Sequence, residues 1–126
     1  MKKVLVIEDN SNLRENTCEI LELAGYEVYC AVNGIEGIGL AKEKKPHIVL
    51  CDIMMPEADG FVVLKELRAN AETSDIPVIF LTASAEKSNV TAALEMGANG
   101  YIRKPFNADE LLQTIELCLK EVSSQL

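Results

Sequence analysis

Short apolar runs alternate with segments of helical periodicity along the whole chain. Five apolar runs have the length of strands, and they lie at residues 4–7, 28–32, 48–51, 78–81 and 101–102. Three of them are continuously apolar, which is typical of strands that are covered on both faces. Strict alternation of strand and helix favours a parallel sheet with right-handed crossovers and helices on both faces. The sequence therefore predicts an α/β fold with a doubly wound five-stranded parallel sheet.

The first and last helical segments show the clearest 3.6-residue period. One face of the first carries Leu13, Thr17, Ile20, Leu21 and Ala24, and one face of the last carries Ala108, Leu111, Leu112, Ile115, Cys118, Leu119 and Val122. Weaker helical segments are expected near residues 35–44, 60–69 and 86–96. Asn107 followed by Glu110 resembles a capping box, and Gly25 and Gly97 stand where helices are expected to end.

Length, net charge and the distribution of apolar residues exclude several classes of protein. The 126 residues fit one domain, which buries about two-thirds of its unfolded surface and needs no metal or disulfide to fold. The net charge of −8, from 12 Lys and Arg against 20 Asp and Glu, argues against nucleic-acid binding by this domain alone, because phosphate contacts supply most of that affinity. No apolar run approaches the roughly 20 residues of a membrane span, and the first residues lack the long apolar stretch that is typical of a signal peptide. We therefore expect a cytoplasmic protein.

The four cysteines show no metal-binding pattern. Cys18, Cys30, Cys51 and Cys118 lack CxxC spacing, and the single His47 does not complete a zinc site with them. Two lie on apolar helix faces and two in strand-like runs. We interpret all four as small core residues with free thiols in a reducing cytosol.

Polar residues stand at the carboxyl ends of the predicted strands, where open parallel sheets place their functional crevice. They are Glu8, Asp9, Asp52, Thr82 and Lys104, the last followed by Pro105. Two like charges about 4 Å apart repel by roughly 4 kcal/mol at an effective dielectric near 20, so a proton or a cation must relieve the repulsion. Three carboxylates give −3, and one divalent ion with the lysine gives +3. Carboxylate oxygens suit Mg²⁺, and the layout suits phosphoryl transfer.

Each of these residues also has a simpler structural explanation. Glu8 and Asp9 fit helix capping or first-turn carboxylates, and Asp52 fits the start of a turn. Thr82 fits an ordinary strand residue, and Lys104 fits a solvated surface charge. A functional site explains all of them at once, at the same edge of one sheet.

The stretches around these residues resemble the receiver domain of two-component response regulators, of the single-domain chemotaxis type. They are residues 4–10, 52–60, 81–83 and 100–106, with the sequences VLVIEDN, DIMMPEADG, LTA and GYIRKPF. The Asp-x-x-Met-Pro-x-x-Asp-Gly loop followed by Thr and Lys-Pro is the most specific part. The resemblance implies a (βα)5 fold with the flavodoxin-like strand order 2-1-3-4-5, and a single receiver domain over residues 1–126, with no output domain visible.

The resemblance also implies a role for each strand-end residue. Asp52 takes a phosphoryl group from a phosphohistidine on a sensor histidine kinase or a histidine phosphotransfer protein. Asp9, Asp52 and the backbone carbonyl of Met54 bind Mg²⁺, and Glu8 acts mainly through metal-bound water. Lys104 pairs with the phosphoryl oxygens. The domain is thus a phosphoacceptor with self-catalysed phosphorylation and dephosphorylation rather than a turnover enzyme.

Further implications concern signalling. Thr82 hydrogen-bonds the phosphoryl group, Tyr101 swings inward behind it, and the face formed by residues 84–122 carries the output. The resemblance also implies a cis peptide bond between Lys104 and Pro105.

Two positions vary within the family pattern and are expected to tune the phosphoryl lifetime. They are Met54, two residues after the acceptor, and Ser84, two residues after the threonine.

The resemblance allows a homodimer through the output face. However, Asn99-Gly100 replaces the acidic pair usual in receivers of winged-helix transcription factors, which argues against their symmetric dimer.

Three other functions are compared with the same residues of the sequence. A haloacid-dehalogenase-like phosphatase needs a second Asp two residues after the nucleophile, where this chain has Met54. A flavodoxin-like or Rossmann nucleotide binder needs Gly, Ser or Thr after the first strand, where this chain has the phosphate-repelling Glu8-Asp9-Asn10. The remaining alternative is a receiver-shaped interaction module that acts without phosphorylation; such modules usually lose an acid, the acceptor or the lysine, and none is missing here.

Overall fold

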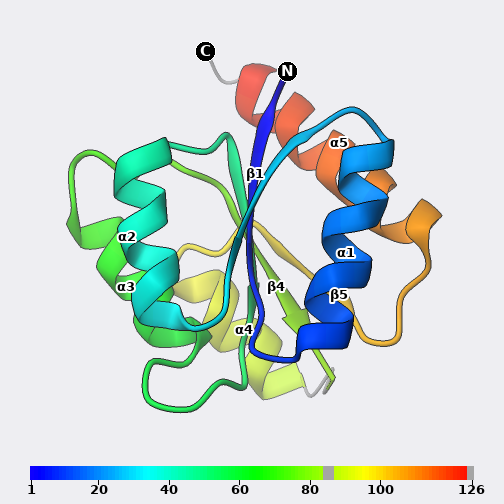
Figure 1. Cartoon of the computed structure of the whole chain (residues 1–126). Helices are drawn as coiled ribbons and strands as arrows, with labels where there is room; N and C mark the ends of the chain where they lie inside the picture. The colour runs from blue at the N-terminus through cyan, green and yellow to red at the C-terminus, as the bar shows by residue number, and fades with distance from the viewer. Residues whose placement is uncertain (84–86, 125–126) are drawn as a thin grey trace.

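A computed structural model describes residues 1–83 and 87–124 of the chain (Figure 1). Strands and helices alternate in the described residues as β1 (Lys3–Ile7), α1 (Ser11–Leu23), β2 (Glu27–Ala31), α2 (Gly34–Lys44), β3 (Ile48–Asp52), α3 (Gly60–Ala69), β4 (Val78–Thr82), α4 (Lys87–Glu95), β5 (Gly100–Arg103) and α5 (Ala108–Ser124). The strands form one parallel sheet in the order β2-β1-β3-β4-β5. The predicted fold class and strand order are therefore confirmed.

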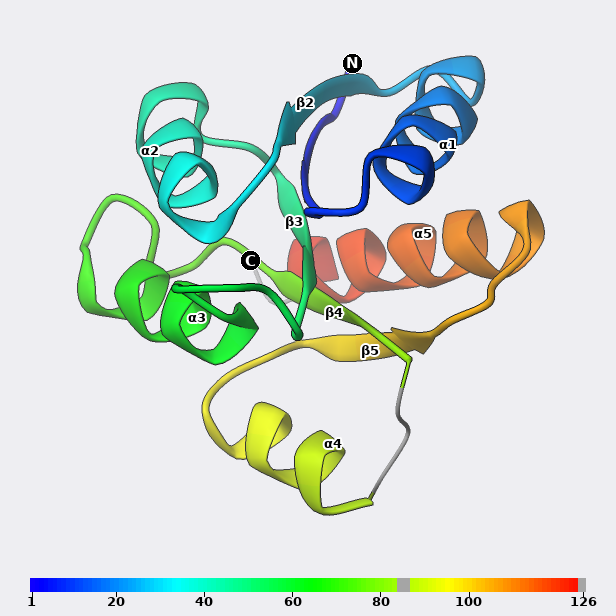
Figure 2. The same ribbon diagram turned by 60° about the horizontal axis from the view of Figure 1, so that its bottom comes forward.

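The helices cover the sheet on both faces, with α1 and α5 on one side and α2, α3 and α4 on the other (Figures 1 and 2). Each side has its own apolar core. Alternate residues of β1 show the division, because Leu5 and Ile7 face one core and Val4 and Val6 face the other. Within the described residues, no helix combines the length and the apolar character needed to cross a bilayer.

The continuous apolar runs are the central strands of this sandwich. Every residue of β3 and β4 is buried, since helices cover both faces of these strands. The edge strand β2 is mostly half-buried and has one exposed residue. Burial of apolar surface, at about 25 cal/mol per Å², therefore stabilises the centre of the sheet most.

Helix ends follow the sequence signals. The side chains of Asn10, Asn33 and Asp59 cap the starts of α1, α2 and α3 by accepting backbone hydrogen bonds. Before α5, Asn107 Oδ1 accepts from the Glu110 N–H at 2.8 Å, and Asn107 Nδ2 donates to Glu110 Oε1 at 2.9 Å. Gly25 and Gly97 follow α1 and α4 with φ of 96° and 103°, a conformation that glycine adopts without steric cost.

The interpretation of the cysteines is wrong for two of them. Cys18 of α1 and Cys30 of β2 form a disulfide, although neither belongs to a CxxC motif. Cys30 is exposed because β2 lies at the edge of the sheet, and α1 packs beside it. Cys51 and Cys118 are free and buried, as predicted.

Gly60 provides a stability prediction for the loop that follows β3. A Cβ at this position would lie 2.8 Å from the Asp52 carbonyl oxygen and 2.9 Å from Phe80 Cε1. Overpacking of this kind forces the backbone to shift, so we expect Gly60→Ala to lower the free energy of unfolding by about 1–3 kcal/mol. Denaturant unfolding measures the change.

A matched glycine in α2 serves as the control. A Cβ at Gly39 would meet no atom within 4 Å. Gly39→Ala is therefore expected to stabilise the protein by roughly 0.5–1 kcal/mol, because alanine loses less backbone entropy in a helix. Equal effects of the two substitutions would contradict the close packing around Gly60.

Candidate functional site at the carboxyl edge of the sheet

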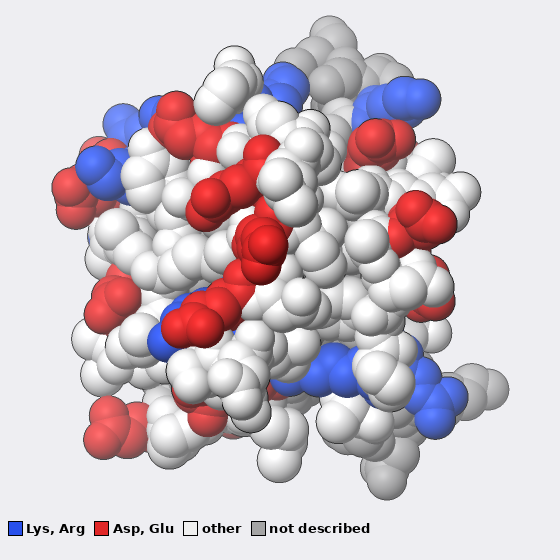
Figure 3. All heavy atoms as spheres, turned by 45° about the vertical axis from the view of Figure 1, so that its right-hand side comes forward, with Lys and Arg blue, Asp and Glu red and all other residues white. Residues whose placement is uncertain are grey.

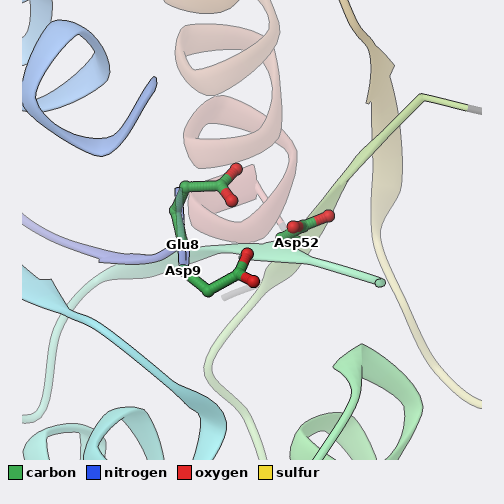
Figure 4. A group of neighbouring side chains, drawn as sticks. All are labelled: Glu8, Asp9 and Asp52. Atoms are coloured by element: carbon green, nitrogen blue, oxygen red, sulfur yellow. The ribbon is translucent and has the colours of Figure 1, made fainter. Parts of the chain in front are cut away.

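The ends of β1 and β3 bring three carboxylates together. Glu8 and Asp9 directly follow β1, and Asp52 is the last residue of β3. One oxygen from each carboxylate lies within 4.8 Å of the others, and Figure 4 shows all three side chains turned to the same side of the strand ends. Glu8 and Asp52 are buried, whereas Asp9 is exposed. A few carboxylate oxygens beside open solvent form the kind of ligand set that Mg²⁺ takes, because this ion keeps several waters.

Lys104 brings a positive charge from the other side of the site. Its Nζ lies 2.8 Å from Glu8 Oε1 and 3.2 Å from Asp52 Oδ1. The backbone N–H of Lys104 donates to the Thr82 carbonyl at 2.8 Å, and the Lys104–Pro105 peptide bond is cis. The chain after β5 is thereby held against the ends of β4 and β3.

The charges at the site do not balance without a further cation or a proton. Burial is the main cause that raises the pKa of Glu8 from 4.5 to about 7; Lys104 opposes this shift and Asp52 adds to it. Burial also works against the charge of Lys104, but the bond to Glu8 and the charge of Asp52 outweigh it and raise the lysine pKa. Three carboxylates and one ammonium leave an excess of two negative charges, and a divalent cation would neutralise them. The chemistry of the donor set therefore fits Mg²⁺.

Glu8 makes the stability of the metal-free protein depend on pH. Its pKa is about 7 in the folded protein, against 4.5 ordinarily, so between these values the folded state binds more protons than the unfolded state. The stabilising contribution of Glu8 to the free energy of unfolding is fully present below pH 4.5 and is lost as the pH rises through 7. Relative to Glu8→Gln, wild type is therefore expected to lose about 2 kcal/mol of unfolding free energy between pH 5 and pH 8.

Denaturant unfolding of both proteins with a chelator at the two pH values measures this loss. Taking the difference between the two proteins removes the contribution of titrating groups that do not contact Glu8. An identical pH dependence in wild type and Glu8→Gln would show that Glu8 titrates normally in the folded protein.

The loop between β3 and α3 holds the Asp52 carboxylate and borders the site. The Met54 backbone N–H donates to Asp52 Oδ1 at 3.3 Å, and the Gly60 N–H donates to the Ile53 carbonyl at 2.9 Å. Asp59 Oδ1 accepts from Val62 and caps α3. The Met54 side chain is 77% exposed, so it stands at the rim of the site rather than in the core.

The residues assigned to switching lie on β4 and β5. Thr82 is buried at the end of β4, one strand away from Asp52. Tyr101 of β5 is 43% exposed and lines a surface cavity of about 160 Å³ beside α5. Its ring is thus directed outward in this structure. Ser84 lies outside the described residues.

Arg14 is a further contributor that the sequence analysis missed. Its guanidinium donates to the backbone carbonyl of Glu8 at 2.9 Å, so α1 holds the turn that carries the acidic pair. The Asn10 N–H adds a bond to Glu8 Oε2 at 3.3 Å. An arginine in a polar helical segment carries no signal of such a role, because its acceptor is a main-chain oxygen.

The fold and the site together define a class of protein. It is a doubly wound five-stranded α/β domain with three carboxylates and a lysine at the carboxyl edge of its sheet. Comparison with known proteins identifies the family, since the family model described as "Response regulator receiver domain" matches residues 4–116. The chain belongs to the response regulator receiver domain family.

Individual relatives agree with this assignment. The DNA-binding dual master transcriptional regulator RpaA of Synechocystis is 37% identical over 120 residues, which is 95% of this chain and 50% of RpaA. Protein PilH of Pseudomonas aeruginosa is 36% identical over 119 residues, which is 94% of this chain and 98% of PilH. The chain thus spans about half of the first relative and nearly all of the second.

Solved structures show the same fold. The Vibrio cholerae chemotaxis protein CheY4 aligns with a TM-score of 0.90 and 30% identity, and covers 94% of this chain and 98% of its own. A CheY-like receiver domain protein from Methanospirillum hungatei aligns with a TM-score of 0.92 and 29% identity, over 100% and 99% of the two chains.

Proposed function

We propose that this receiver domain accepts a phosphoryl group on Asp52 from a phosphohistidine of a sensor histidine kinase or a histidine phosphotransfer protein. The observation that carries the proposal is the placement of Lys104, whose Nζ lies 3.2 Å from Asp52 and 2.8 Å from Glu8. A carboxylate is a weak nucleophile, and two anions must approach each other. Positive charge fixed beside the acceptor lowers the energy barrier to the reaction of the two anions.

Mg²⁺ is the cofactor that this donor set fits. Asp9 and Asp52 would hold the ion, together with the Met54 carbonyl, and Glu8 would contact it through water. Bound there, the ion supplies positive charge for the transferred phosphoryl oxygens. The protein's own residues hold the acceptor oxygen in place, since Met54 N–H and Lys104 both contact Asp52 Oδ1.

Phosphorylation is proposed to switch the face formed by α4, β5 and α5. It replaces one negative charge on Asp52 with about two and adds strong acceptor oxygens. Asp52 pairs with Leu81 across β3 and β4, so the Thr82 hydroxyl is well placed to bond the new oxygens. Forming that bond would move Thr82 and the end of β4. Phe80 of β4 pairs with Tyr101 of β5, so the movement of β4 would reach the tyrosine. Movement of Tyr101 inward would then change the surface that an output domain or a second copy contacts.

As a phosphoacceptor, the domain is also proposed to catalyse its own phosphorylation and dephosphorylation. Because sensor kinases present phosphohistidine in the cytoplasm, we place the domain there. The competing function is a receiver-shaped interaction module that acts without phosphorylation. The retained acids and the lysine favour the phosphoacceptor.

Met54 is expected to control how fast water removes the phosphoryl group. Its backbone N–H bonds to Asp52 Oδ1 and its side chain is exposed at the rim of the site, where it is proposed to limit the access of water to Asp52. Met54→Asn removes the apolar cover and adds a group that can orient water, so we expect dephosphorylation to be about fivefold faster while phosphorylation persists. Decay of the phosphorylated protein, followed by mass, measures the rate.

Val62→Ala is the control, because it removes an exposed apolar side chain from the first turn of α3. The same tuning role is proposed for Ser84. Unchanged decay with a charged residue at both Met54 and Ser84 would contradict it.

Intact-protein mass after incubation with acetyl phosphate tests the proposed function. One labile phosphoryl adduct that forms with Mg²⁺ and is lost with a chelator supports the phosphoacceptor. If acetyl phosphate gives no adduct, a phosphorylated histidine phosphotransfer protein replaces it as the donor. Failure with both donors would favour the interaction module.

A further inference from the structure

The Cys18–Cys30 disulfide lies outside the phosphoryl-transfer site and plays no part in the proposed function. It joins α1 to the edge strand β2. Cys30 is exposed, whereas Cys18 is only 6% exposed. A surface cavity of about 390 Å³ opens at the bond, and it is lined by Arg14, Glu15, Cys18, Glu19, Glu22 and Cys30. A small reagent in solution can therefore reach the sulfur atoms.

The surroundings of the bond are charged. Figure 3 shows acidic side chains in a row across the face that α1 and α5 present, and the three glutamates of the cavity all belong to α1. The other residues that line the cavity at the bond, Arg14 and the three glutamates, all carry charge.

We propose that Cys18 and Cys30 form a reversible redox site, closed by exchange with a small-molecule or protein disulfide and opened by a dithiol. In closing, the Cys30 thiolate attacks one sulfur of the external disulfide, forms a mixed disulfide and releases the first thiol. The Cys18 thiolate then attacks Cys30 Sγ and expels the second thiol. Two protein thiols are oxidised, and the external disulfide is reduced to two thiols that take up the two protons.

The other two cysteines do not take part in this chemistry. Cys51 and Cys118 are buried and free, and burial is the main cause that raises the pKa of both thiols. Thiol–disulfide exchange needs the thiolate, so both react slowly in the folded protein. They act as internal standards when thiols are counted.

The redox site is connected to the acidic site through Arg14. This arginine lies one helical turn before Cys18 on α1, lines the same cavity and donates to the Glu8 carbonyl at 2.9 Å. The closed bond fixes α1 to β2, and Arg14 thereby fixes the turn that carries Glu8 and Asp9. This step rests on the proposed function. Because a preorganised site loses less entropy on binding, we expect the closed form to bind Mg²⁺ about threefold more tightly than the open form.

Thiol counting tests the redox site without reference to phosphorylation. The folded protein is equilibrated with either excess oxidised or excess reduced dithiothreitol, then unfolded, alkylated and weighed. Closed protein is expected to carry two alkyl groups, on the two free cysteines, and open protein four, one for each cysteine. Cys30→Ser changes an exposed residue, so it keeps the fold, and it should carry three under both conditions.

Two outcomes would overturn the redox site. Four alkyl groups on wild type under excess oxidant would mean that the bond does not close. Two alkyl groups after reduction of the folded protein would mean that the bond is inert and only structural.

Calorimetric titration with Mg²⁺ tests the connection to the acidic site. The closed wild-type protein is expected to bind about threefold more tightly than the open protein, and Cys30→Ser is expected to match the open form under both conditions. Equal affinities would overturn the connection while leaving the thiol count valid. Absence of Mg²⁺ binding in both forms would instead count against the proposed function.

Discussion

Asp52→Asn is expected to abolish the phosphoryl adduct, with a fall of at least about a thousandfold in its rate of formation. An amide does not act as a nucleophile toward phosphorus, yet asparagine keeps the shape of the side chain and an oxygen for the Met54 N–H. The neighbouring acids are poor substitutes. Glu8 is buried, bonded to Lys104 and has a raised pKa, and Asp9 is exposed at the position proposed to bind the metal. Single-turnover incubation with acetyl phosphate, followed by intact mass, measures the loss.

Asp59→Asn is the matched control for this experiment. It makes the same chemical change seven residues further on, at the cap of α3, where Oδ1 accepts from Val62. Asparagine caps a helix as well as aspartate does, so this variant is expected to phosphorylate like wild type. An adduct of wild-type yield on Asp52→Asn would show that another residue is the acceptor.

Lys104→Met is expected to lower the rate of phosphorylation by about a hundredfold or more, at saturating Mg²⁺. The substitution keeps much of the side-chain length but removes the ammonium that contacts both Glu8 and Asp52. The incoming phosphoryl group then meets an acceptor with one compensating charge fewer. The rate is measured with acetyl phosphate over a range of Mg²⁺ concentrations.

Arg103→Met controls for the loss of one positive charge, because it removes the charge at the position directly before Lys104. Arg103 ends β5 and is exposed, so a nearly normal rate is expected. A Lys104→Met rate within about threefold of wild type would contradict the electrostatic role of the lysine.

The edge of the sheet that carries the site was predictable from local patterns. Continuous apolar runs indicated strands covered on both faces, and strand–helix alternation indicated that those strands are parallel. Parallel strands end at a common edge, so Glu8, Asp52 and Lys104 were expected to meet there, and their distances bear this out. The order of the strands came from the family resemblance, because periodicity alone does not say which strands are neighbours.

Contacts that depend on how elements pack escaped the sequence analysis. The Cys18–Cys30 disulfide requires α1 to lie over the edge strand with one particular face, and the spacing of the cysteines does not encode that rotation. Arg14 was missed because it bonds to a main-chain carbonyl. The outward direction of Tyr101 likewise depends on the packing of β5 against α5. In each case the determining quantity is the relative placement of two elements.

Chemical trapping of the phosphorylated side chain shows directly whether Asp52 is the acceptor. Wild-type protein is incubated with Mg²⁺ and acetyl phosphate, reduced with borohydride, which converts an aspartyl phosphate to homoserine, and digested for peptide mass analysis. Homoserine is expected at position 52, and only when both the metal and the phosphodonor are present. Homoserine at position 9, or no reduced residue in protein that carries the adduct, would contradict it.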